Sequence, residues 1–233
     1  MSKFLYSFLL FLALLIGFSQ TSEAQRILGA VSLGTNLTQV DGDDLFGFRK
    51  VGLNVGPMIE IPFGAKKHWS VSMELLYSQK GSSHKGGSDS LYSYTYKLVQ
   101  DYAEIPVLVH YSDRRAIAGG VGFSYGQLIN YKETSNTFYD QYFKYQTGLS
   151  NFDVSVIADL QIRLWSKLWA NLRYQYSLKS NRTVYIDKSI LNPPQNPETR
   201  YQYNNVISIR LTWVFNQQKI SKLPKKERDD TIY

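Results

Sequence analysis

Apolar and polar residues alternate along most of the chain beyond about residue 25, and this period of two predicts β-strands. The clearest example runs from Phe152 to Arg163, where only Ile157 departs from the alternation. Two later segments repeat the pattern, with apolar faces formed by Leu168, Ala170, Leu172, Tyr174, Tyr176 and Leu178, and by Ile207, Ile209, Leu211, Trp213 and Phe215. We therefore expect three long strands, each with one apolar face and one polar face.

Five earlier segments carry the same pattern less regularly. They predict strands near 26–39, 49–61, 69–80, 94–111 and 115–130, so that the chain would have eight strands. Pro106 lies inside one of them and has no N–H to donate, which predicts a bulge or a locally unpaired position. The glycines between Ala118 and Phe123 allow sharp bending of the fifth strand.

The connections between these strands alternate in length. Long connections at 40–48, 81–93, 131–148 and 180–202 alternate with short ones at 62–67, 112–115 and 165–167. Outer-membrane barrels have short periplasmic turns and longer extracellular loops. We therefore predict an all-β fold: an eight-stranded antiparallel up-and-down transmembrane β-barrel, preceded by a signal peptide and with both ends of the barrel chain in the periplasm.

A soluble β-sandwich or lipocalin-like barrel would show the same alternation, but its apolar faces would point inward. Two features favour the membrane. The apolar faces have about five or six positions per strand. Because these are every second residue, each face spans close to the 9–11 residues that a tilted strand needs to cross a bilayer. Aromatic residues gather toward the strand ends, as in an interfacial girdle; these are Tyr77, Tyr111, Tyr125, Tyr131, Trp165, Trp169, Tyr176, Trp213 and Phe215.

The N-terminal segment has the pattern of an export signal. Lys3 precedes an apolar run from Phe4 to Phe18, and the small residues Ser22 and Ala24 fit a signal-peptidase site before Gln25. A retained membrane anchor is the alternative, although the run is shorter than the roughly 20 residues of a spanning helix. We expect a signal peptide at 1–24, a barrel at 25–216 and a polar periplasmic tail at 217–233.

Charged residues occur on the polar faces of the predicted strands. In a membrane barrel these faces line the lumen, and an eight-stranded barrel is just wide enough for side chains to fill it. The predicted lumen charge network consists of Glu60, Glu74, Glu104, Asp153, Asp159, Arg163, Arg173 and Arg210. Because unpaired buried charges are costly, we expect these side chains to pair. A proton or ion path through them is the alternative.

Composition and motifs offer little chemistry beyond this. The chain has no cysteine, which excludes disulfides and thiolate sites. Its net charge of +7 is spread along the chain, so we expect no nucleic-acid partner. His68, His84 and His110 are not spaced as metal ligands, and the acidic segment 41–44 lacks the spacing of an EF-hand. A cluster of His84 with Ser82, Ser83 and Asp89 could imitate a hydrolase site in a Gly/Ser-rich loop. We predict no catalytic residues, no cofactor and no metal.

Three segments resemble the PorT-like family of outer-membrane β-barrel proteins: 33–43 (LGTNLTQVDGD), 69–81 (WSVSMELLYSQKG) and 101–109 (DYAEIPVLV), with Leu172-Arg173-Tyr174 also fitting. The resemblance implies an outer-membrane barrel without a cofactor. The namesake branch of the family is associated with type IX secretion and gliding, whereas other members have no known role.

Two functions of different class follow from these patterns. The first is a non-enzymatic structural or assembly component of the envelope, in contact with outer-membrane lipid and with envelope or secretion-machinery proteins. The second is a porin-like barrel that conducts or binds a small solute. The basic tail at 217–233 is expected to be disordered or to dock a periplasmic partner.

Overall fold

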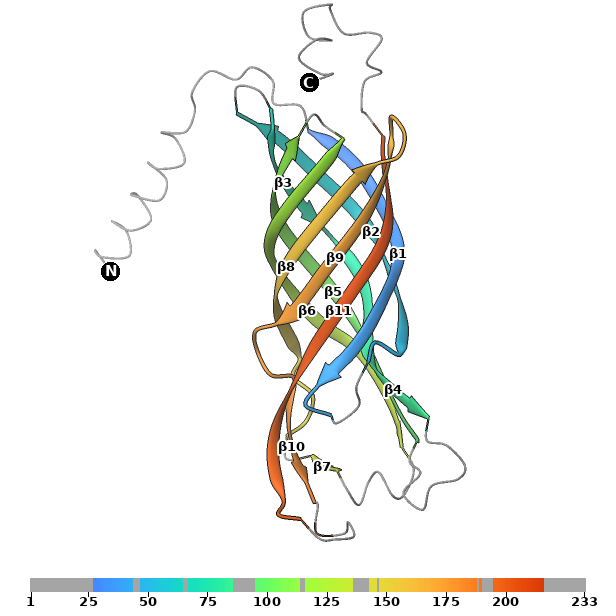
Figure 1. The fold of residues 1–233 in the computed structure, drawn as a ribbon, viewed down its shortest axis with the longest axis vertical. Coiled ribbons are helices and arrows are strands. Elements are labelled where there is room, and N and C mark those ends of the chain that lie inside the picture. Colours follow the sequence, from blue (N-terminus) through green and yellow to red (C-terminus); the bar gives the residue numbers. More distant parts are fainter. Residues whose placement is uncertain are drawn as a thin grey trace, which may run out of the picture.

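Eight antiparallel strand positions form a closed ring (Figure 1). The computed structural model describes residues 27–43, 47–64, 67–85, 95–113, 116–135, 143–145, 147–187, 189 and 195–215. The ring consists of β1 (Leu28–Asp41), β2 (Lys50–Phe63), β3 (Trp69–Glu74) continued by β4 (Leu76–Lys85), β5 (Thr95–Asp113), β6 (Ile117–Ser135), β8 (Phe152–Arg163), β9 (Leu168–Ser177) and β11 (Glu198–Val214). Pairing of β11 with β1, from Ala30↔Val214 to Asp41↔Tyr203, closes it. The predicted eight-stranded up-and-down topology is confirmed.

The apolar faces of the strands point outward and the polar faces point into the barrel. Val121 and Ile209 are 65% and 56% exposed, whereas Asn36 and Arg210 on the opposite faces are almost fully buried. A soluble barrel would have the reverse arrangement. The facing therefore agrees with the membrane alternative, in which lipid covers the outer surface.

The third strand position is interrupted opposite two prolines. The ladder between β3 and β5 ends at Met73↔Val107, and that between β4 and β5 resumes in the same register at Leu76↔Glu104. Pro106 lies in this gap and has no N–H to donate to the ladder. The predicted unpaired position is therefore present, and the register does not shift at Pro106. Pro57 of β2 borders the gap on the other side, where its carbonyl accepts the Leu75 N–H. The register shift of β5 lies instead between Asp101 and Tyr102.

The long connections lie at one end of the barrel, here called the long-loop end, at the bottom of Figure 1. The predicted loops at 131–148 and 180–202 are partly wrong, because strands occupy parts of both. In the first, β6 continues to Ser135 and is followed by the short strand β7 (Phe143–Tyr145). In the second, β10 (Arg182–Ile186) precedes β11, which begins at Glu198. β10 pairs with β11 and β7 with β10, so they supply backbone partners that local sequence does not reveal. The opposite end, with the short connections, is called the short-turn end.

Apolar side chains gather in the barrel interior near each end, and these two groups are called the apolar layers. Near the short-turn end, Ala30, Met58 and Val214 form a buried cluster against which Trp169 packs. The prediction that Trp169 belongs to the outer girdle is therefore wrong, because it shares the inward face of β9 with Asn171 and Arg173. At the long-loop end a second buried cluster consists of Val40, Tyr96, Leu98, Val184 and Ile186, with Leu149 packed against it. Mainly polar side chains fill the interior between the two layers, and the buried Leu76, Leu108 and Ile157 lie among them.

Candidate functional site: the lumen between the apolar layers

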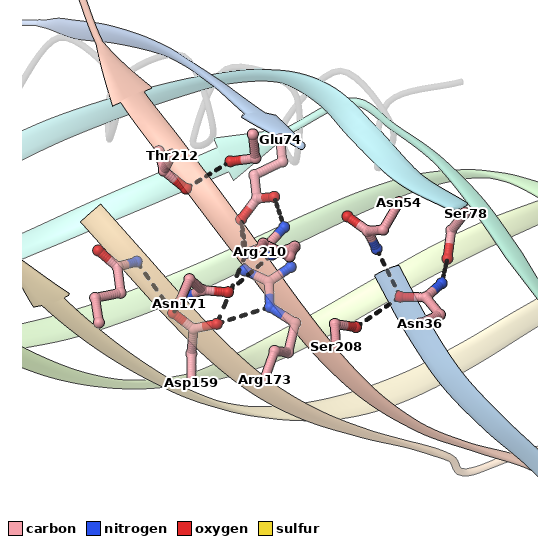
Figure 2. A network of polar contacts seen from close by, with 12 residues as sticks. Asn36, Asn54, Glu74, Ser78, Asp159, Asn171, Arg173, Ser208, Arg210 and Thr212 are labelled. Carbon is pink, nitrogen blue, oxygen red and sulfur yellow. Dashed lines mark hydrogen bonds and ion pairs between the residues drawn. The ribbon is translucent and has the colours of Figure 1, made fainter. Parts of the chain in front are cut away.

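Two arginines and two carboxylates form the centre of the lumen, here called the central cluster (Figure 2). Arg173 Nη2 lies 2.5 Å from Glu74 Oε1, and Arg173 Nε lies 2.8 Å from Asp159 Oδ1. Arg210 Nη1 lies 2.7 Å from Glu74 Oε2. The four side chains come from β3, β8, β9 and β11 and are almost fully buried. Charges buried to this extent are tolerated because each faces an opposite charge.

Polar neighbours occupy the remaining positions around Asp159. Its Oδ2 accepts hydrogen bonds from Asn171 Nδ2 at 2.7 Å and Gln161 Nε2 at 3.0 Å, and lies 3.0 Å from His110 Nε2. His110 fits because Gly120 on the neighbouring strand has no side chain: a Cβ there would lie 2.1 Å from His110 Cδ2. The glycine in β6 therefore serves packing at this position.

A lysine pairs with two further carboxylates, and these three residues are called the second cluster. Lys80 Nζ of β4 lies 2.5 Å from Glu104 Oε1 and 3.0 Å from Asp153 Oδ2. Asn204 Nδ2 also donates to Asp153 Oδ2, at 3.1 Å. The ammonium group lies 5.1 Å from the centroid of the Tyr102 ring, within the range of a cation–π contact.

Amide and hydroxyl groups also bond across the lumen. Asn36 of β1 donates to Ser78 Oγ at 3.0 Å, and its Oδ1 accepts from Asn54 Nδ2 at 3.1 Å and Ser208 Oγ at 2.7 Å (Figure 2). These bonds tie β1 to β2, β4 and β11. Because β2 and β11 flank β1 on opposite sides and β4 lies beyond β2, the bonds fix the cross-section of the barrel.

An arginine joins two walls of the barrel near the long-loop end. Arg182 Nη1 and Nη2 donate to the two carboxylate oxygens of Glu133 at 3.0 and 2.9 Å. The same guanidinium donates to the Tyr96 hydroxyl at 2.6 Å and to Gln202 Oε1 at 2.7 Å. These contacts link β10 and β11 to β5 and β6 beside the apolar layer.

Six of the eight residues predicted for the lumen network lie in these two clusters: Glu74, Glu104, Asp153, Asp159, Arg173 and Arg210. Glu60 and Arg163 lie near the short-turn end and are only half-buried. Arg163 lies over the Trp169 ring at 5.8 Å and donates to the Ser166 carbonyl.

The lumen residues that sequence reasoning missed include Lys80, His110 and Arg182. Lys80 and His110 stand an even number of residues from Glu74 and Glu104 on the same predicted strands, so strict alternation would have placed them inward. Arg182 lay in a predicted loop, and only the pairing of β10 reveals its position.

Within the part of the chain that the structure describes, the other candidate residues do not converge on one site. His84 lies in β4, contrary to its predicted loop position, and its Nδ1 lies 3.3 Å from Arg49 Nη1. His68 Nδ1 lies 3.0 Å from the Ser112 carbonyl oxygen. Asp41 accepts hydrogen bonds from Gln39 and Asn205. Asp89 and Asp44 are outside the described residues, as are the predicted signal peptide and tail.

Comparison with known families now identifies the architecture. Residues 18–182 match the family model described as "Outer membrane protein beta-barrel domain". The chain belongs to this outer-membrane β-barrel family. It is therefore an outer-membrane protein, and its outward apolar surface is the lipid-facing surface. The curated proteins include no significant match to this chain.

Solved structures of outer-membrane proteins resemble this one at low sequence identity. Ail, the attachment invasion locus protein of Yersinia pestis, solved with the heparin analogue sucrose octasulfate, is 11% identical with a TM-score of 0.43; the match covers 82% of this chain and 99% of Ail. OprG of Pseudomonas aeruginosa is 14% identical (TM-score 0.34, covering 81% and 94% of the two chains). CarO of Acinetobacter baumannii is 10% identical (TM-score 0.41, covering 80% and 97%).

Proposed function

We propose that this protein is a non-conducting and non-enzymatic barrel that serves as a structural or assembly component of the outer membrane. The observation that carries the proposal is the filled lumen, in which two clusters of ion pairs lie between two apolar layers. Paired charges and packed apolar side chains leave hydrated ions no favourable route. The long-loop end is proposed to face the cell exterior, because extracellular loops of such barrels are the longer ones.

A conductance measurement in planar bilayers tests this proposal. The purified full-length protein is expected to insert without producing steady single-channel steps. A known porin inserted under the same conditions serves as the positive control for detection. Steady pores of solute-passing size in preparations shown to be folded would overturn the proposal.

The porin-like alternative has one observation in its favour. Both side-chain polar atoms of Gln100 are buried without a hydrogen-bond partner among the described residues, as are those of Asn181. Such groups could contact water or a small polar solute. Solute flux into liposomes would separate the two functions, because a structural barrel should release no trapped solute.

Association with type IX secretion is the finer form of the proposal and rests on the resemblance to PorT-like proteins. Residues 1–24 are proposed to act as a cleaved export signal and residues 217–233 as a periplasmic docking tail. A pull-down from outer membranes, with and without residues 217–233, tests the tail. Recovery of the same envelope proteins by both forms would eliminate a docking role.

A further inference from the structure

The outward face of β3 and β4, β5 and β6 changes in composition along the barrel axis. Strand registers arrange the outward residues in rows that cross these three neighbouring strand positions. Nearest the short-turn end lies the aromatic pair Trp69–Tyr111, with ring centroids 5.0 Å apart. Toward the long-loop end, an apolar row contains Met73, Val107 and Phe123, and a polar row contains Gln79, Asp101 and Asn130. Three rows that each contain a lysine follow, here called the basic rows: Val99 and Lys132; Ser83, Lys97 and Thr134; and Lys85 and Thr95.

The depth of these rows follows from strand geometry. A residue advances about 3.4 Å along a strand, and a tilt of about 40° reduces this to about 2.6 Å along the membrane normal. An apolar band about 25 Å tall that begins at Tyr111 therefore ends near Asp101, roughly ten residues away. On the same scale Lys132 and Lys97 lie roughly 5 and 10 Å beyond that boundary, which is the level of lipid headgroups.

The basic rows carry charge available to a ligand. Lys85, Lys97 and Lys132 are exposed, and no ion pair joins them to the other described residues. Ser83, Thr95 and Thr134 lie in the same rows and supply hydroxyl donors. A surface of ammonium and hydroxyl groups in this arrangement suits an anion with several oxygens, such as a phosphate.

The carboxylate next to the basic rows is already occupied. Asp101 accepts hydrogen bonds from the Tyr77 hydroxyl at 2.9 Å, Gln79 Nε2 at 2.9 Å and Asn130 Nδ2 at 3.3 Å. Lys50 Nζ in turn lies 3.4 Å from Gln79 Oε1. These donors offset the negative charge of Asp101, so it opposes an anion on the neighbouring rows only weakly.

The other side of the rim has a different composition. On β1 and β11, Gln39 and Asn205 donate to Asp41, and Tyr203 stacks on Tyr176 of β9 at 6.2 Å. This side offers an acidic and aromatic surface at the level where β5 and β6 present lysines. The basic rows of β4, β5 and β6 therefore do not continue onto β1 and β11.

We propose that the outward face formed by Lys85, Lys97 and Lys132, with Ser83, Thr95 and Thr134, binds the phosphate groups of membrane lipid headgroups. The lipid is favoured as the occupant because this face continues the lipid-facing surface of the same three strands, and because its charge is complementary to phosphate. The assignment to the outer leaflet rests on the orientation proposed above. The binding itself does not depend on that orientation.

Lipid titration of the full-length protein in a non-ionic detergent, followed by native mass spectrometry, tests the proposal. The probes are diphosphorylated lipid A and the same lipid with its phosphates removed. The unchanged protein is expected to bind the phosphorylated form at least about tenfold more tightly, since each lysine near a lipid surface is worth about a fivefold change and the face holds three lysines. The variant K97Q/K132Q should lose this preference, whereas the control K144Q/K179Q should keep it, because Lys144 of β7 and Lys179, which follows β9, lie at the same end but outside the basic rows.

Three outcomes would overturn the proposal: equal binding of the two lipid forms, an unchanged preference in K97Q/K132Q, or complete loss of the preference in millimolar inorganic phosphate, which would indicate a site for free phosphate. Heat-dependent gel mobility of each variant establishes that the barrel is folded. No conductance enters these measurements, so a conducting barrel could still pass this test and a non-conducting one could still fail it.

Discussion

Arg173 and Glu74 lie 99 positions apart in the sequence, and their side chains meet at 2.5 Å in the middle of the barrel. Glu74 also pairs with Arg210, so a single carboxylate holds two guanidinium groups. Removing the carboxylate would leave both cations in a buried position with less compensation. The pairs around Glu74 are therefore expected to decide whether the lumen remains filled.

Replacing Glu74 with Gln should lower the free energy of unfolding by about 3 to 5 kcal/mol, because a partner of a buried pair is lost while its cations remain buried. Urea unfolding of vesicle-embedded protein, followed by tryptophan fluorescence, measures the effect. Lys144→Gln is the matched control. Lys144 pairs with Asp187 at the surface, and such a pair contributes at most about 1 kcal/mol. Equal effects of the two changes would contradict the importance of the central cluster.

Replacing Gly120 with Ala should displace His110 from Asp159, since the added Cβ would lie 2.1 Å from the imidazole Cδ2. Overpacking of this kind costs about 1 to 3 kcal/mol in the free energy of unfolding. Gly119→Ala is a close control, because a Cβ at Gly119 meets no atom within 4 Å. The double variant H110A/G120A should recover part of the loss; if it is no more stable than Gly120→Ala, the clash with His110 is not the cause.

The number of ring strands and their inward faces could be predicted from the sequence, whereas the pairing of side chains inside the barrel could not. Alternation identified the inward faces, so Glu74, Asp159 and Arg173 could be placed in the lumen before any contact was known. Their pairing depends on strand register and barrel curvature, which join residues of non-adjacent strands and leave no local signal. Strands such as β10 were missed for the same reason, since their hydrogen-bond partners lie in another part of the chain.

Replacing Val107 with Arg should lower the free energy of unfolding in lipid vesicles by about 2 to 4 kcal/mol, because the residue faces lipid near the middle of the apolar band. Thr134→Arg introduces the same charge on the outward face of β6 above the band and should cost at most about 1 kcal/mol. Reversible urea titration in thin-bilayer vesicles measures both. Val107→Arg with no greater cost than Thr134→Arg would show that this face does not contact hydrocarbon.

Replacing Arg182 with Ala should loosen the long-loop end and leave the barrel folded. Arg182 joins β10 to Glu133 of β6 and to the Tyr96 hydroxyl of β5. The strands of the ring pair with one another through backbone hydrogen bonds that do not involve the Arg182 side chain. Limited proteolysis should therefore cut the variant faster between β9 and β11, while heat-dependent gel mobility of the barrel stays unchanged.

Lys144→Ala provides the control for that experiment, because it removes a contact on the same strand pair without touching Arg182. Lys144 donates to Asp187, and the hydrogen bonds from Ser189 and Lys144 lower the pKa of the Asp187 carboxyl. This surface pair should therefore persist at neutral pH, and its loss should change cleavage less than the loss of Arg182. If Lys144→Ala is cleaved faster than Arg182→Ala, the Lys144–Asp187 contact restrains the long-loop end more than the Arg182–Glu133 contact does.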